Sequence, residues 1–138
     1  MGRWHRMLSI SLMATLALGA AQVVLFGPMQ GMWNLLFFGR ATAPDGFSTE
    51  AMAYIVFLYG VLGAVLAGFA VALLAIARGP LRRGERLAWW SMVGALATWF
   101  VLDVGFSFWT GFWANALLNM AFGAALFLPL WKLRPFLQ

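Results

Sequence analysis

Four long apolar stretches constrain this chain more than any other feature of its sequence. They cover residues 7–26, 51–77, 87–110 and 112–131. A helix needs about 20 residues to cross the hydrocarbon core of a bilayer, and each stretch is about that long. Charged residues make up only 9% of the chain, whereas a soluble domain carries about a quarter. The sequence therefore predicts an all-α integral membrane protein, with four transmembrane helices in one compact bundle formed by residues 1–138.

The basic residues lie almost entirely on one side of the predicted spans. Eight of the nine lysines and arginines precede the first span, join the second to the third, or follow the fourth, and only Arg40 lies in the opposite loop. This bias predicts that both termini are cytoplasmic, in a bacterial cytoplasmic membrane. It also argues against nucleic-acid binding, despite the net charge of +5. The loop arginines are predicted to contact lipid head groups; they are Arg78, Arg82, Arg83 and Arg86.

The first two spans carry patterns that predict helix packing. Arginines precede the first span and small residues end it, as in a signal peptide, but we interpret it as a retained span. Its polar residues share one helical face, which we expect to point into the bundle; they are Ser11, Thr15 and Gln22. In the second span, a small residue recurs at every fourth position, which predicts close packing on that face, either within the bundle or against a partner helix. This stripe consists of Gly60, Ala64, Gly68 and Ala72.

Residues 28–38 are too apolar for an ordinary loop and too few to span a membrane. We expect Pro28 to end the first span, and the segment after it to lie in the outer interface. Thr49 is predicted to cap the next helix. Tryptophans near the ends of the spans predict an aromatic belt of interfacial anchors; these are Trp33, Trp89, Trp90, Trp109, Trp113 and Trp131.

Asp103 is the only ionisable residue well inside an apolar stretch. A carboxylate at membrane depth is costly unless it is paired, solvated or protonated, so a functional role is the default interpretation. Each span has a hydrogen-bonding side chain in its predicted outer half, which suggests a polar layer opening outward, partly covered by residues 28–38. The candidate ligand- or ion-binding residues are Asp103, Ser107, Asn115, Asn119, Tyr59, Gln22 and Trp99. The alternative is ordinary interhelical packing through hydrogen bonds.

Several kinds of chemistry lack the residues they need. His5, the only histidine, precedes the first span, and the chain has no cysteine and no lysine within a span. Histidine-ligated haem or metal, thiolate chemistry and a retinal Schiff base are therefore not expected. We expect no metal site and no catalytic residue.

Three functions remain open at this stage. The first is a non-catalytic accessory or scaffold subunit of a larger membrane complex, or a component that binds a lipophilic ligand such as lipid, quinone or pigment. Its expected partners are membrane lipids and other membrane protein chains. The second is a small transporter or channel in which Asp103 binds a proton or cation. The third, a lipid-modifying membrane enzyme with Asp103 as acid or base, has the least support, because one carboxylate lacks a nucleophile or metal to work with.

Overall fold

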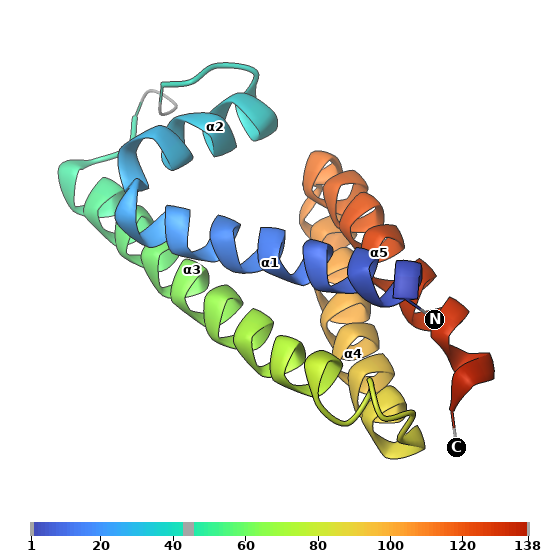
Figure 1. The fold of residues 1–138 in the computed structure, drawn as a ribbon. Helices are drawn as coiled ribbons and strands as arrows, with labels where there is room; N and C mark the ends of the chain where they lie inside the picture. The colour runs from blue at the N-terminus through green and yellow to red at the C-terminus, as the bar shows by residue number, and fades with distance from the viewer. Residues whose placement is uncertain (1, 43–45, 138) are drawn as a thin grey trace. The chain divides into compact units, whose positions relative to one another are not determined.

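The computed structural model describes residues 2–42 and 46–137, and every regular element in these ranges is helical. The elements are α1 (Gly2–Val24), α2 (Phe26–Phe38), α3 (Thr49–Arg78), α4 (Arg86–Thr110), α5 (Trp113–Leu133) and a 3-10 turn, η1 (Arg134–Phe136) (Figure 1). Four of these helices are long and apolar enough to cross a membrane, namely α1, α3, α4 and α5. The predicted all-α membrane fold with four spans is confirmed, and the short segment expected after the first span is a helix, α2.

The chain divides into two compact units. One unit contains residues 2–13 and 71–137 of the described chain, and therefore α4, α5, the first half of α1 and the end of α3. The other unit contains residues 14–70, with the rest of α1, all of α2 and most of α3. The single compact domain predicted for residues 1–138 stays a prediction.

Within residues 14–70, α1 and α3 cross with almost no space between their backbones. A Cβ atom added to Gly19 would lie 2.7 Å from the backbone nitrogen of Ala67 and 2.7 Å from the carbonyl oxygen of Gly63. A Cβ atom added to Gly63 would lie 2.7 Å from the Cβ atom of Gln22 and 2.7 Å from the carbonyl oxygen of Gly19. Both glycines are therefore required by the close approach of the helices.

The small-residue stripe predicted on α3 does not form the contact with α1, and its packing against a partner helix stays a prediction. Nothing lies within 4 Å of the position that a Cβ atom would take at Gly60 or Gly68, and Ala64 is exposed. The contact with α1 uses Gly63 and Ala67 instead. Both sets of residues have the spacing of a small-residue packing motif, so spacing alone could not show which face meets Gly19.

The first span also ends earlier than predicted. Helix α1 ends at Val24, and Pro28 lies in the first turn of the next helix, α2, instead of ending the first span. A proline is tolerated there because the first N–H groups of a helix have no partner within it. At α3, the cap is Ser48 rather than the predicted Thr49, because the Ser48 hydroxyl accepts a hydrogen bond from the backbone N–H of Ala51 at 3.2 Å.

In the other unit, α4 and α5 form an antiparallel pair joined by a tight turn (Figure 1). Gly111 ends α4 with a φ of 80°, a left-handed conformation that favours glycine. Trp89 of α4 is 2% exposed, and its indole N–H donates to the carbonyl oxygen of Leu130 at 2.8 Å. These contacts fix α5 against α4 at both ends of the pair.

The first half of α1 is attached to the same unit by two side chains. Ser11 donates to the carbonyl oxygen of Ala125 in α5 at 3.2 Å, and Nε2 of His5 is 2.6 Å from the carbonyl oxygen of Ala77 in α3. Thr15 and Gln22 are buried and Ser11 is half-buried, so the polar face predicted for α1 does point into the protein.

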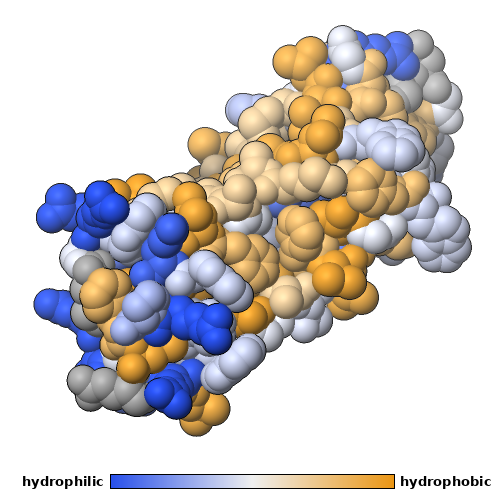
Figure 2. Space-filling model, turned by 90° about the vertical axis from the view of Figure 1, so that its right-hand side faces the viewer, coloured by the Kyte–Doolittle hydropathy of each residue, from blue (hydrophilic) through white to orange (hydrophobic). Residues whose placement is uncertain are grey.

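The tryptophans predicted to form an aromatic belt differ in their exposure. Four of them are exposed: Trp90, Trp109, Trp113 and Trp131. Trp33 and Trp89 are buried, and the role of all six as interfacial anchors stays a prediction. On the face shown in Figure 2, hydrophobic side chains cover most of the surface, and hydrophilic side chains gather in one dense group and in a smaller, separate one. This distribution is the one that a membrane-spanning surface requires.

Candidate functional site

The site centres on Asp103, a half-buried residue of α4 whose carboxylate contacts α5. The side-chain amide nitrogen of Asn115 donates to Oδ1 of Asp103 at 2.9 Å and to the hydroxyl oxygen of Ser107 at 2.7 Å. An amide nitrogen carries two hydrogens, so both of these bonds can form at once. The three side chains therefore form one hydrogen-bonded cluster between α4 and α5.

The hydroxyl of Ser107 contributes little to the carboxylate. It donates to the backbone carbonyl oxygen of Asp103 at 2.7 Å and is 3.4 Å from the carboxylate oxygen Oδ1. A hydroxyl has one hydrogen to donate, and the shorter bond uses it. Oδ1 thus receives one strong hydrogen bond, from Asn115. Within residues 2–42 and 46–137, no hydrogen bond reaches Oδ2 and no basic side chain pairs with the carboxylate.

The sequence produces this cluster through helix spacing and a short turn. Asp103 and Ser107 are one turn apart on α4, so they share a face. The tight turn at Gly111 fixes the register of α5 against that face, and its backbone is held by the bond from the N–H of Phe112 to the carbonyl oxygen of Ser107 at 2.9 Å. The prediction that a tight hairpin would bring Asn115 near Asp103 and Ser107 is confirmed.

Asn119 of α5 is a second polar residue of the α4–α5 pair whose hydrogen bonding is incomplete. It is 7% exposed, and its side-chain nitrogen Nδ2 is buried without a hydrogen-bond partner among the described residues. Asn115, one turn before it, contacts Asp103, and the position that a Cβ atom would take at Gly123, one turn after it, is 2.9 Å from the ring of Phe100. Both neighbours face α4, so Asn119 lies on the α4-facing side of α5, one turn along the helix from the cluster.

The remaining predicted site residues are divided between the two compact units. Trp99 is half-buried on α4, and its ring contacts Phe100 with centroids 6.3 Å apart. Gln22 and Tyr59 belong to the other unit, where Gln22 packs at the crossing of α1 and α3. The polar layer that would join them to Asp103, and its cover by residues 28–38, stay predictions.

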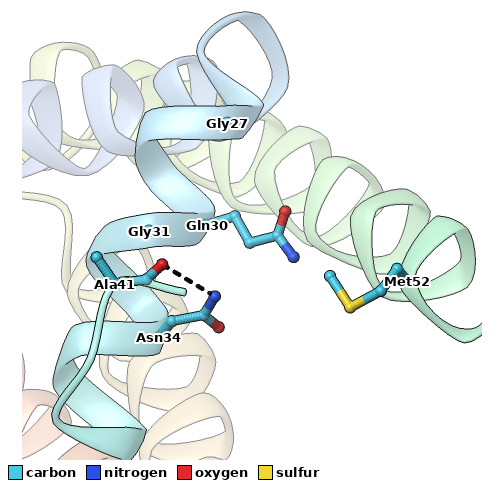
Figure 3. Close-up of a pocket in the computed structure, with 6 residues that line it drawn as sticks. All are labelled: Gly27, Gln30, Gly31, Asn34, Ala41 and Met52. Carbon is cyan, nitrogen blue, oxygen red and sulfur yellow. Dashed lines mark hydrogen bonds between the residues drawn. The ribbon is translucent and has the colours of Figure 1, made fainter. Parts of the chain in front are cut away.

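A separate polar pocket, of about 160 Å³, lies beside α2 (Figure 3). It is lined by Gly27, Gln30, Gly31, Asn34, Ala41 and Met52. Asn34 is buried and donates to the carbonyl oxygen of Ala41 at 3.4 Å, while the amide of Gln30 extends toward Met52. Gln30 and Asn34 were not among the predicted site residues. Their spacing of four residues within an apolar segment, the same as that of Asn115 and Asn119, is the signal that identifies them.

The arginines predicted to contact head groups differ in their surroundings. Arg83 pairs with Glu85, with its Nε 2.7 Å from a carboxylate oxygen, and both side chains are well exposed. Arg82 lines a pocket with residues of α1. Arg78 and Arg86 are exposed at the end of α3 and the start of α4. The loop is therefore not a uniform basic surface.

Comparison with known proteins gives no family for this chain. No family model, curated protein or solved structure matches it. Among the described residues, no group of three or more His, Asp or Glu side chains could hold a metal ion. The polar groups of the cluster are the carboxylate of Asp103, the hydroxyl of Ser107 and the amide of Asn115.

Proposed function

We propose that this chain is a non-catalytic membrane protein that binds the polar head of a lipophilic ligand, such as a lipid or quinone, at the cluster of Asp103, Ser107 and Asn115. In this proposal it serves as an accessory or ligand-binding component of a larger membrane assembly. The basic ends of its helices lie in the cytoplasm, so the cluster faces the opposite half of the bilayer.

The incomplete hydrogen bonding of Asp103 carries the proposal. A carboxylate in low-dielectric surroundings needs several donors or a positive partner, and a polar group left without them costs several kcal/mol in lipid, of the order of 2–7. Asp103 receives one strong bond, on Oδ1. A ligand hydroxyl or amine that donates to Oδ2 would supply the missing partner.

Asn119 supplies the complementary group. Its buried Nδ2 can donate to a carbonyl, ester or ether oxygen. The two positions together suit a head group that has a donor and an acceptor a few bonds apart. Glycerol esters and the reduced forms of quinones have this combination, whereas a simple hydrocarbon has neither group.

The test is the set of lipophilic molecules retained by the purified full chain. Wild type, Asp103→Asn and the control Ser91→Ala are extracted in mild detergent, and bound species are quantified by mass spectrometry of the organic extract. Ser91 also lies on α4, but is exposed and bonds only to the carbonyl oxygen of Leu87. A specific species should be depleted about tenfold by Asp103→Asn, equivalent to about 1.4 kcal/mol, and unchanged by Ser91→Ala. The same species at the same level in all three proteins would contradict ligand binding at Asp103.

The accessory role is supported by the large aromatic side chains that the chain exposes, among them Trp90, Phe106 and Trp109 of α4. Rings of this kind suit contacts with lipid or with another membrane chain. Cross-linking in intact membranes should yield a discrete adduct with a defined partner at fixed stoichiometry. Recovery of only the lone chain and its homo-adducts would contradict the accessory role while leaving ligand binding to be decided by the extraction.

A small transporter or channel is the second candidate, favoured by the same unbonded oxygen of Asp103. A proton or a monovalent cation could occupy Oδ2 in place of a ligand donor. In proteoliposomes loaded with a pH-sensitive dye, this function requires ion flux that Asp103→Asn abolishes. Equal flux through wild-type and variant vesicles would contradict it.

A further inference from the structure

A second pocket, of about 340 Å³, is formed by the start of α1 and the turn between α3 and α4. It is lined by Gly2, His5, Arg6 and Arg82. His5 and Arg6 follow Gly2 by three and four residues, so these three residues lie on one face at the start of α1. Arg82 comes from the turn between α3 and α4. All four belong to the same compact unit, and none belongs to the α4–α5 cluster.

The walls of this pocket are held in place by the surrounding structure. His5 contacts the carbonyl oxygen of Ala77 through Nε2 at 2.6 Å, which fastens α1 to the end of α3. The turn that carries Arg82 is closed by backbone hydrogen bonds, from Leu81 to Ile76 at 3.0 Å and from Glu85 to Pro80 at 3.2 Å. Leu81, next to Arg82, is 1% exposed and anchors the turn. The two arginines therefore project from fixed backbone.

Among the described residues, no acidic side chain pairs with the arginines of the pocket. Glu85 is the sole acidic residue in the chain segments on this side of the spans, and its carboxylate pairs with Arg83 at 2.7 Å. No ion pair is formed by Arg6 or Arg82 within the described ranges. Two guanidinium groups at one pocket repel each other, so an anion between them is favoured.

We infer that this pocket binds a phosphate group. Guanidinium groups present a planar fork of N–H donors that matches phosphate oxygens and forms charge-assisted hydrogen bonds. Gly2 places the start of α1 at the same pocket, where backbone N–H groups and the helix dipole add to the attraction for an anion. The phosphate could belong to an anionic phospholipid head group or be free in solution, and the chemistry of recognition is the same.

The sequence had assigned head-group contacts to the four loop arginines as a set, and the geometry separates them. Arg82 faces a pocket with Arg6, whereas Arg83, its immediate neighbour, is neutralised by Glu85. This difference supplies a matched control. Arg82→Gln and Arg83→Gln remove the same charge from adjacent positions, but only the first removes a wall of the pocket.

The experiment uses the full chain and two phosphate probes. Inorganic phosphate is titrated calorimetrically against protein in a neutral detergent, and native mass spectrometry counts lipids retained from phosphatidylcholine nanodiscs containing phosphatidylglycerol. Retention of phosphatidylglycerol without phosphate binding identifies a lipid ligand, and phosphate binding without lipid preference identifies a soluble one. Either result supports the inference, provided that Arg6→Gln and Arg82→Gln each weaken binding about tenfold and Arg83→Gln changes it less than about twofold.

Two outcomes would overturn the inference. One is the absence of binding with both probes. The other is an equal loss in Arg82→Gln and Arg83→Gln, which would show diffuse attraction to a basic loop rather than a pocket. If a glutamine variant does not elute as a monodisperse protein, Arg6→Lys and Arg82→Lys replace it. They keep the charge but lose the fork, so binding should still fall several-fold, and Arg83→Lys should again have no effect.

Discussion

The hydroxyl of Ser11 in α1 occupies the hydrogen-bonding position that Pro129 leaves empty in α5. In a regular helix, the carbonyl of Ala125 would accept from the backbone N–H four residues later, but that residue is Pro129, which has none. Ser11 donates to this carbonyl instead, at 3.2 Å. A proline in the middle of a span is therefore accommodated by a side chain from another helix, as membrane helices require.

This relationship predicts a coupling between the two residues. Ser11→Ala should lower the free energy of unfolding by about 1 kcal/mol, because a buried carbonyl loses its donor in a medium without water. In a Pro129→Ala background, the restored N–H satisfies Ala125, so Ser11→Ala should cost clearly less. A double-mutant cycle measured by unfolding in denaturing detergent tests this. Additive effects would show that the bond does not stabilise the protein.

Trp89 should contribute to stability through its indole N–H as well as its ring. The carbonyl of Leu130 lies in the last turn of α5, where the next backbone donor, that of Arg134, bonds to Trp131 instead. Trp89→Phe keeps most of the ring but removes the donor, and should cost about 1–2 kcal/mol in unfolding free energy. Trp90→Phe is the control, since its side chain is exposed and should change stability by less than about 0.5 kcal/mol. Similar losses in both variants would refute a specific role for the bond.

The crossing of α1 and α3 predicts opposite effects for glycines of the same helix. Gly63→Ala places a methyl group 2.7 Å from two atoms of α1 and should destabilise the protein by about 1–3 kcal/mol. Gly60→Ala and Gly68→Ala meet open space and should be neutral or slightly stabilising, because alanine is the better helix former. Thermal unfolding of the three variants decides the matter, and a Gly60→Ala variant as unstable as Gly63→Ala would show that α3 packs through the other face.

Asn119 is expected to destabilise the unliganded protein and to contribute to binding of the ligand. Asn119→Leu keeps a similar volume and removes a buried donor without a partner, so the unliganded protein should become more stable by about 1 kcal/mol. The same variant should lose the ligand depleted by Asp103→Asn. Asn115→Leu is the comparison, because it removes the one strong bond to Oδ1 of Asp103 and should destabilise. A destabilised Asn119→Leu variant would indicate a packing role for the amide.

The sequence was sufficient to predict the fold class and the contact between Asn115 and Asp103. The four spans followed from apolar length, and the approach of Asn115 to Asp103 followed from helix spacing and a two-residue turn, both of which are local. The sequence could not predict which face of a helix is buried, because this depends on how one helix is rotated against another. The packing face of α3 is set by where Gly19 fits, and the burial of Trp89 depends on Leu130 and Trp131, which lie far along the chain. The start of α2 before Pro28 was missed because a proline is equally compatible with the end of one helix and the first turn of the next.

The donors for the two carbonyls of α5 have a consequence for how the chain is assembled. Ala125 and Leu130 are satisfied by Ser11 of α1 and Trp89 of α4, both of which are synthesised before α5. An unsatisfied carbonyl in lipid costs several kcal/mol, of the order of 2–7. The last span can therefore settle in the bilayer at full hydrogen bonding only beside helices that are already there. During translation, the helices that carry both donors therefore emerge from the ribosome before α5 does.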